Sequence, residues 1–166
     1  MIRTRSRPSI YPLEIDEQKA CWEWLGLQLL GPGSGNTFQD YSYMVPNGTQ
    51  LAGGRNRRAA YMASLKAQGF RVGVSDLVIA VPHGDYHGAY IEVKRVKEAY
   101  AGKAALASAV RPEQKDWLIK MHVMGYWVGV AYGAMDFRRL LRSYIRKEPP
   151  DRLDFIPGMG DTQAAQ

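Results

Sequence analysis

Two short apolar segments joined by a turn most constrain how this chain can fold. Residues 77–81 and 89–94 have the length and composition of β-strands, and the residues between them are rich in Gly and Pro. This pattern predicts an antiparallel hairpin. If the turn is centred near Gly84, Asp76 lies opposite Glu92 at the far end of the hairpin.

The two acids at that position call for a physical explanation. Directly opposed side chains of an antiparallel pair have Cβ atoms about 4.5–5.5 Å apart, and like charges there are destabilising. A divalent cation between Asp76 and Glu92 would remove the repulsion and use both as oxygen ligands, which Mg²⁺ prefers. Strand alternation places Lys94 on the same face as Glu92. Two carboxylates that hold a metal and an ammonium that orients or deprotonates water suit phosphodiester hydrolysis. A solvated charged hairpin face is the alternative explanation.

The remaining periodicity predicts a mixed α and β order around this hairpin. The expected fold class is therefore α/β, with a central hairpin. Residues 98–110 form an Ala-rich insert that is either a loop or a marginal helix. We expect helices over about 13–30, 57–68, 111–124 and 135–146, and further strands over 41–45 and 126–132. The domain organisation expected from the sequence is a basic N-terminal arm over 1–11, one domain over 12–146 and a flexible tail over 147–166.

Length, charge and cysteine content narrow the class of protein. A chain of 166 residues fits one domain, and 22 Lys and Arg against 16 Asp and Glu leave a net charge of +6, which favours a polyanionic partner. No apolar run approaches the roughly 20 residues of a membrane span. No apolar stretch follows the basic N-terminus, so a secretory signal is not expected. The single Cys21 suits a reducing cytoplasm. No phosphate-binding loop or dinucleotide fingerprint occurs.

Four polar residues fall on helix faces that are otherwise apolar. In the first helix Glu14, Glu17 and Gln18 share an arc with Cys21, although carboxylates are seldom buried without a partner. A frayed first turn, where acids favour the helix dipole, explains them equally well. In the third helix Gln114 shares a face with Leu118. It could hydrogen-bond a water or the Lys94 ammonium, or it could be a core Gln satisfied by the backbone.

The motifs taken in order resemble a known family. The chain is similar, over about residues 12–146, to the virus-type replication-repair nuclease (VRR-Nuc) family of the PD-(D/E)XK superfamily, in its stand-alone phage and bacterial form. The segments that carry the resemblance are Glu14-x-x-Glu17-Gln18, Pro46-Asn47-Gly48, Arg57-Arg58, residues 65–69, Gly73-Val74-Ser75-Asp76-Leu77, Ile91-Glu92-Val93-Lys94, residues 112–117 and Gly125-Tyr126. In that family a Pro is usual where Ser75 stands. A Ser expected before the third helix is replaced by the insert and Arg111-Pro112.

The resemblance implies a restriction-endonuclease-like core, a mixed sheet flanked by helices, with an Mg²⁺ or Mn²⁺ site on the central hairpin. Lys94 would position or activate the attacking water, and Gln114 would support the site. A Glu of the first helix would complete the metal shell, and periodicity does not separate Glu14 from Glu17. The implied catalytic residues are Asp76, Glu92, Lys94 and Gln114, and the implied metal-site residues are Asp76, Glu92, Val93 and either Glu14 or Glu17.

The resemblance also gives the basic residues a use. It implies a metal-dependent, structure-specific DNA endonuclease of the cytoplasm of a bacterial or phage-infected cell, and small members of the family resolve four-way (Holliday) junctions as homodimers. The alternative is a DNA-binding module of the same fold without hydrolysis.

Arg139, Arg142 and Arg146 form a stripe along the last helix, which either neutralises phosphates or is a solvated helix face. His83 and His87 flank the hairpin turn and are more typical of a surface than of a metal site. The expected DNA-binding residues are Asn47, Arg55, Arg57, Arg58 and Lys66.

Overall fold

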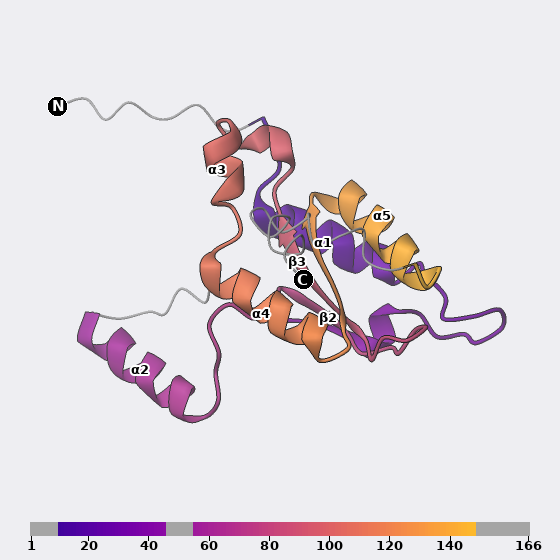
Figure 1. Cartoon of the computed structure of the whole chain (residues 1–166), viewed down its shortest axis with the longest axis horizontal. Coiled ribbons are helices and arrows are strands. Elements are labelled where there is room, and N and C mark those ends of the chain that lie inside the picture. Colours follow the sequence, from indigo (N-terminus) through magenta and orange to yellow (C-terminus); the bar gives the residue numbers. More distant parts are fainter. Residues whose placement is uncertain (1–9, 46–54, 149–166) are drawn as a thin grey trace, which may run out of the picture.

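The core of the protein is a four-stranded mixed sheet flanked by helices, seen in a computed structural model that describes residues 10–45 and 55–148 (Figure 1). The strands follow one another across the sheet in the order β1-β2-β3-β4. The first three are antiparallel neighbours, and β3 and β4 are parallel. Their bounds are β1 Ser42–Met44, β2 Leu77–Ile79, β3 Ala89–Lys94 and β4 Trp127–Tyr132. The expected α/β class with a central hairpin is confirmed.

The register of the β2–β3 hairpin is the predicted one. Leu77 pairs with Ile91, and Ile79 pairs with Ala89. Asp76 directly precedes Leu77 and Glu92 directly follows Ile91, so the same register brings the two acids together. The Asp76 carboxylate also accepts a hydrogen bond from the Val93 amide at 2.9 Å, which continues the contact between the two segments beyond the last ladder pair.

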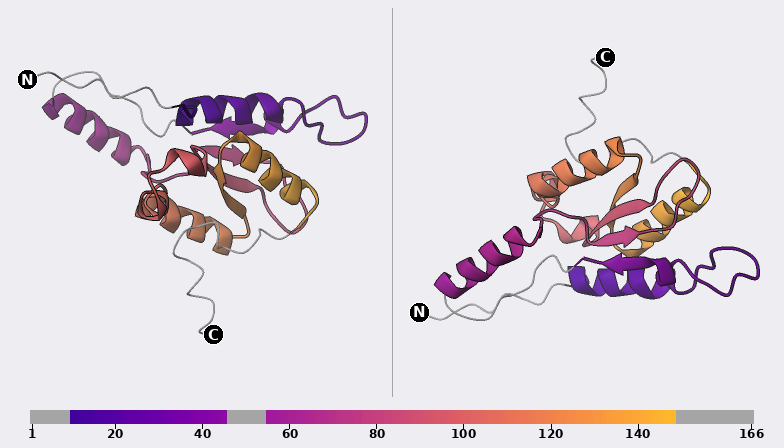
Figure 2. Two further views of the ribbon diagram at one scale, coloured as in Figure 1. Left: turned by 90° about the horizontal axis from the view of Figure 1, so that it is seen from above. Right: turned by 90° about the horizontal axis from the view of Figure 1, so that it is seen from below.

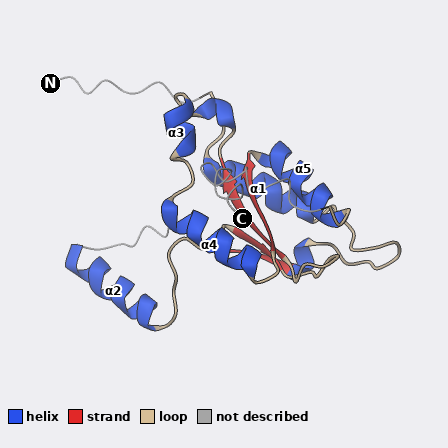
Figure 3. Cartoon of the chain, in the orientation of Figure 1, coloured by secondary structure: helices blue, strands red, loops and turns tan. Residues whose placement is uncertain are grey.

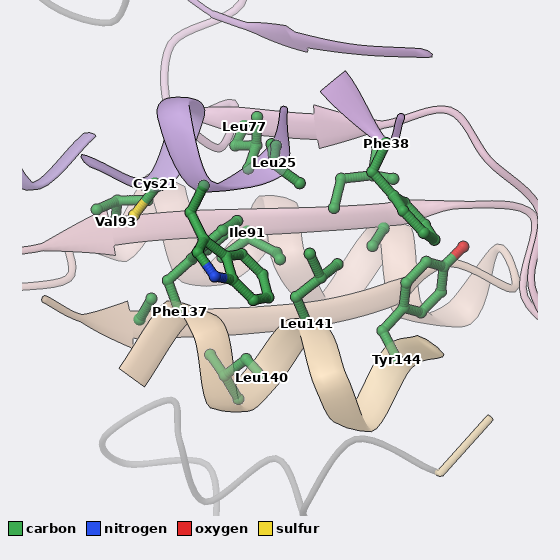
Figure 4. Packing of buried hydrophobic residues seen from close by; sticks show 14 of the residues in the cluster. Cys21, Leu25, Phe38, Leu77, Ile91, Val93, Phe137, Leu140, Leu141 and Tyr144 are labelled. Atoms are coloured by element: carbon green, nitrogen blue, oxygen red, sulfur yellow. The ribbon is translucent and has the colours of Figure 1, made fainter. Parts of the chain in front are cut away.

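Helices cover both faces of the sheet (Figure 2). Helices α1 (Glu14–Leu25) and α5 (Ala134–Ile145) pack against one face and against each other, while α4 (Pro112–Val123) covers β3 and β4 on the other. A helical crossover is the usual connection between parallel strands, and α4 makes this one. The main core lies between the sheet and the α1–α5 layer (Figure 4), and its labelled members are Cys21, Leu25, Phe38, Leu77, Ile91, Val93, Phe137, Leu140, Leu141 and Tyr144.

Period-two alternation along β3 sends its side chains to the two faces in turn. Ile91 and Val93 enter the main core with α1 and α5. Tyr90 packs on the other side with Leu118 of α4, in a smaller second core. Glu92 and Lys94 therefore belong to the face of the sheet that α4 covers, and they lie at the end of β3 from which the chain leaves the sheet.

Helix α2 (Arg55–Ala67) lies to one side of the sheet and its flanking helices (Figure 3). Its described side chains are mostly exposed, including Tyr61, which is 51% exposed. Gly69 follows the helix with φ +94°, a left-handed conformation that glycine adopts freely, and it caps the C-terminal end of the helix.

Two expectations need correction. The first helix was expected to reach residue 30 but ends at Leu25, and Leu29, placed on its apolar arc, is 58% exposed. The chain turns back on itself after Gly26. Two backbone hydrogen bonds hold this turn, one from the Leu30 N–H to the Asn36 carbonyl and one from the Phe38 N–H to the Gln28 carbonyl. The insert contains both structures that were considered for it, a 3₁₀ turn (η2, Lys97–Ala99) and a short helix (α3, Lys103–Ala107), joined by loop.

The expected terminal segments fall largely outside the described residues. Of the basic arm only residues 10–11 are described, and of the tail only residues 147–148. Among the helices that the structure describes, none combines the length and the apolar character of a membrane span.

Candidate active site

The sequence places two charged side chains on one face of β3, and the fold buries both. Glu92 is fully buried and Lys94 is 6% exposed. The Lys94 Nζ lies 2.7 Å from the Glu92 Oε1 and 3.5 Å from the Glu14 Oε1 at the start of α1. A buried ion pair of this kind is rarely retained for stability alone, because desolvation of the two charges offsets much of their attraction.

Asp76 brings a second carboxyl group to Glu92. It is 4% exposed, and its contact with the Val93 amide fixes it beside β3. Burial raises the pKa of Glu92 to about 8, and the charge of Asp76 and a hydrogen bond shared by the two carboxyls act in the same direction. The Lys94 ammonium opposes this rise. The two acids that the hairpin register predicted as neighbours are therefore close enough to interact strongly.

Gln114 holds Glu92 from the first turn of α4. Its side-chain oxygen accepts the Arg111 backbone N–H at 2.9 Å, so its NH₂ group is turned toward the sheet and donates to the Glu92 Oε1. The same side chain thus caps the start of α4 and orients the carboxylate. Of the two interpretations left open by its helical position, satisfaction by the backbone applies to the side-chain oxygen, and the NH₂ group meets Glu92 in place of a water or the Lys94 ammonium.

The second oxygen of Glu92 has no such partner. Glu92 Oε2 is buried and makes no hydrogen bond to any described residue. An unpaired buried carboxylate oxygen costs stability unless a cation or another donor reaches it. This oxygen is therefore the atom of Glu92 that is available to bind a cation or to accept a hydrogen bond.

The geometry separates the two glutamates of α1. Glu14 faces Lys94, and burial raises its pKa, with the charge of Asp76 adding to the rise while Lys94 and Arg111 oppose it. Glu17 is 6% exposed and accepts the backbone N–H of Ala134 at 2.8 Å, at the first residue of α5. Glu14 therefore belongs to the cluster around Lys94, and Glu17 caps a helix.

The charges around Lys94 act on it in opposite senses. Burial works to lower the pKa of Lys94, but the attraction of Glu92, reinforced by Glu14 and Asp76, outweighs it and raises that pKa above the usual value. The surrounding acids therefore stabilise the charged, ammonium form of Lys94.

These residues can be tested as a site for a divalent metal by the chemistry of their donors. Asp76, Glu92 and Glu14 supply hard carboxylate oxygens, and the buried, unpaired Glu92 Oε2 is a free ligand position. Three ionised acids against one ammonium leave two negative charges, which one dication would balance. Within the described ranges no three His, Cys, Asp or Glu side chains are grouped tightly enough to hold a metal by themselves, so Asp76 and Glu92 form the fitting pair and Glu14 lies further out.

The other residues predicted for the site are distributed as follows. The Val93 side chain is fully buried in the core, so only its main-chain carbonyl can serve as a ligand. Asn47 lies outside the described residues. Arg55, Arg57 and Arg58 lie on α2, where the structure gives their backbone only, and Lys66 of the same helix is exposed.

The two histidines near the turn do not form a shared site. The His83 Nε2 is hydrogen-bonded to the Ile145 carbonyl, and its ring packs against Tyr144. The His87 ring packs against Tyr126 instead. Each ring is thus engaged with a different neighbour, in agreement with the expectation of two surface histidines.

Three residues near the site were not singled out for it by the sequence pattern. Arg111 acts on the charge of Glu14 from the start of α4, and Tyr100 interacts electrostatically with both Glu14 and Lys94. Ser75 is fully buried, and its hydroxyl has no partner among the described residues. Tyr100 belongs to the insert and Arg111 directly follows it. Only the tertiary structure shows that the insert brings these two residues to the site.

Comparison with known proteins identifies the family of the chain. A family model described as the VRR-NUC domain matches residues 36–135. A solved structure titled "VRR_NUC domain protein" is similar with a TM-score of 0.63 and 24% identity, over 84% of this chain and 93% of that one. No curated protein matches the chain. The matched segment spans more than half of the chain and contains the hairpin and α4, and the protein therefore belongs to the VRR-NUC domain family, a family of nucleases.

Proposed function

We propose that this protein is an Mg²⁺- or Mn²⁺-dependent endonuclease that hydrolyses phosphodiester bonds in DNA. The observation that carries the proposal is the buried pair of Asp76 and Glu92 with the Lys94 ammonium against it. Two adjacent buried acids are costly without compensating positive charge, and one ammonium balances only one of them. Membership of a nuclease family supports the same function.

The residues around this pair have distinct roles in the proposal. Asp76, Glu92 and the Val93 carbonyl would hold the metal, with Glu14 completing its shell. When bound, the metal would polarise the scissile phosphate and lower the pKa of an attacking water. Gln114 keeps the Glu92 carboxylate in one orientation through its NH₂ donor.

Lys94 would act directly on the reacting groups. Its ammonium carries three N–H donors, and its contacts with Glu92 and Glu14 use two of them. The remaining donor would orient the attacking water or a phosphate oxygen. Because the carboxylates hold the ammonium in place, the donor is positioned before the substrate arrives, which lowers the entropic part of the barrier.

We place the preferred substrate among branched DNAs, with the four-way (Holliday) junction as the most symmetric case and DNA repair as the corresponding role. One small site cuts one strand, so paired symmetrical nicks require two sites and hence a homodimer. Light scattering coupled to size-exclusion chromatography tests this, since a mass of 18.6 kDa at working concentration would contradict the dimer.

A cleavage assay tests the activity itself. Junction, flap and duplex DNAs are incubated with Mg²⁺, with Mn²⁺ and with EDTA. We expect cutting with either metal and none with EDTA. Lys94→Ala should abolish cutting and retain binding, while Lys120→Ala, which removes an exposed lysine paired with Asp116 on α4, should cut like the wild type.

Two outcomes would refute the proposal. Equal cutting by Lys94→Ala and the wild type would show that the chemistry lies elsewhere. Binding of all three DNAs without cutting under either metal would identify a DNA-binding module of the same fold.

A further inference from the structure

The outer face of α5 carries four arginines around a hollow in the surface. Phe137, Leu140, Leu141 and Tyr144 bury the opposite face of this helix in the core. The hollow measures about 400 Å³, and its lining consists of Arg138, Arg139, Arg142 and Arg146, here called the α5 arginine cluster, together with Met135 and Ser143. A surface hollow lined mainly by guanidinium groups attracts anions, because it concentrates positive potential.

Two members of the cluster are paired with no carboxylate of the described residues. The guanidinium carbons of Arg138 and Arg142 lie 5.8 and 5.9 Å from the centre of the Trp24 ring, on the neighbouring helix α1. Neither forms an ion pair within the described part of the chain, and the Arg138 Nε is buried without a hydrogen-bond partner there. The aromatic face thus holds both charges in place without neutralising them.

The other two members are paired with acids. Arg139 forms an ion pair with Asp136 at 3.0 Å, and Arg146 lies 3.9 Å from Glu148. The arginine of each pair is solvent-exposed, and at such positions ion pairs contribute little free energy and a phosphate can compete for the cation. The cluster therefore keeps at least two positive charges available for a ligand.

The spacing of the cluster matches a nucleic-acid strand. Arg138, Arg142 and Arg146 follow one another at intervals of four residues, which spans about 12 Å along a helix. A strand of duplex DNA carries one phosphate per about 3.4 Å of its axis, so this row covers three to four phosphates. Guanidinium groups bind phosphate oxygens with two parallel hydrogen bonds, a geometry that lysine cannot provide.

The main chain at the start of α5 adjoins the end of β3 that carries Lys94. The Gly133 amide donates to the Lys94 carbonyl at 2.9 Å, and α5 starts at the next residue. Arg138 follows Gly133 by five residues, about 7.5 Å along the helix axis. Because α5 covers the face of the sheet opposite to the one that holds Glu92 and Lys94, a DNA strand cut beside Lys94 would reach the cluster after passing this edge of the sheet.

We propose that the α5 arginine cluster is a second DNA contact, which binds the sugar–phosphate backbone away from the bond that is cut. This inference rests on the proposed function, in that DNA is taken to be the substrate. The cluster makes contacts with phosphates only, so it adds affinity and positions the substrate without reading its sequence.

The test is the salt dependence of DNA binding in EDTA, where no cleavage is expected. Fluorescence anisotropy of a labelled duplex gives the affinity of the full chain between 50 and 200 mM salt. Each lost phosphate contact lowers the slope of log affinity against log salt by about 0.9. The double variant Arg142→Gln/Arg146→Gln should lower it by about 1.8, so that salt weakens binding about tenfold less than in the wild type over this range.

The control removes two positive charges elsewhere. Lys19→Gln/Lys120→Gln changes exposed residues of α1 and α4 and should keep the wild-type slope. All variants are first checked for unchanged melting temperatures, which is expected because Arg142 and Arg146 are exposed. An equal slope in the arginine variant and the wild type, or an equal loss in both double variants, would overturn the proposal.

The result also distinguishes this inference from the proposed function. A protein that cuts DNA but keeps its slope in the arginine variant retains the function and loses the second contact. A protein that binds DNA with the expected change of slope but never cuts it retains the contact and loses the endonuclease activity. Under cleavage conditions the arginine variant should show a raised KM and a nearly unchanged kcat on long substrates, since the contact lies outside the reacting atoms.

Discussion

The hydrogen bonds of Gln114 allow one prediction to be worked out in detail. Gln114→Met keeps the volume and shape of the side chain but removes its amide. The Glu92 carboxylate then loses a donor, and the Arg111 backbone N–H loses its acceptor. A hydrogen bond to a charged buried group contributes about 1.5–3 kcal/mol, and a helix N-terminal cap about 1 kcal/mol.

We therefore expect Gln114→Met to lower the free energy of unfolding of the metal-free protein by about 3 kcal/mol at pH 9, where Glu92 is ionised. Urea unfolding in EDTA measures this value. Packing is controlled by Trp117→Phe, which changes a partly buried side chain on the same helix and leaves both hydrogen bonds intact. A double-mutant cycle with Glu92→Leu measures how much of this loss comes from the hydrogen bond to Glu92. In the Glu92→Leu background, the Gln114 substitution should lower the free energy of unfolding by about 1.5–3 kcal/mol less than it does in the wild type.

Two results would refute this reasoning. A loss below about 0.5 kcal/mol in Gln114→Met would mean that neither hydrogen bond contributes as the structure suggests. Additive effects of the Gln114 and Glu92 substitutions would mean that the two side chains do not act on one another, whatever the size of each single effect.

Three further predictions concern the acids and the cysteine. Because the pKa of Glu92 is raised to about 8, the stability that its protonated form provides in EDTA is complete below its unfolded pKa of about 4.5 and is lost as pH rises through 8. Melting temperatures from pH 5 to 9 should fall less in Glu92→Gln than in the wild type, and parallel curves would contradict the prediction. Glu17→Gln should lower stability by about 1 kcal/mol through its cap at Ala134 and keep DNA cleavage, whereas Glu14→Gln should reduce cleavage; the reverse pattern would exchange their roles. Cys21 is fully buried, and burial raises the pKa of its thiol to about 12. A thiol reagent should therefore label Cys21 in urea and leave the native protein unlabelled for hours. Rapid labelling of the native protein would contradict its burial.

Local sequence determined the β2–β3 hairpin and therefore the meeting of Asp76 with Glu92. Strand pairing with a short turn leaves few possible registers, and alternation then decides which side chains share a face. The same local rules predicted β3 with its observed bounds and brought Lys94 to the face of Glu92. These features depend on residues within about twenty positions of one another.

Tertiary structure alone decided which distant groups complete the cluster. Glu14 and Glu17 are three residues apart on one helix face and are equivalent to any periodicity. Only the position of α5 allows Glu17 to accept a hydrogen bond from the Ala134 backbone N–H, and only the end of β3 places the Lys94 ammonium beside Glu14. The orientation of Gln114 likewise follows from the packing of α4 over Glu92, because a helical pattern states which face is buried and says nothing of the partner it meets there.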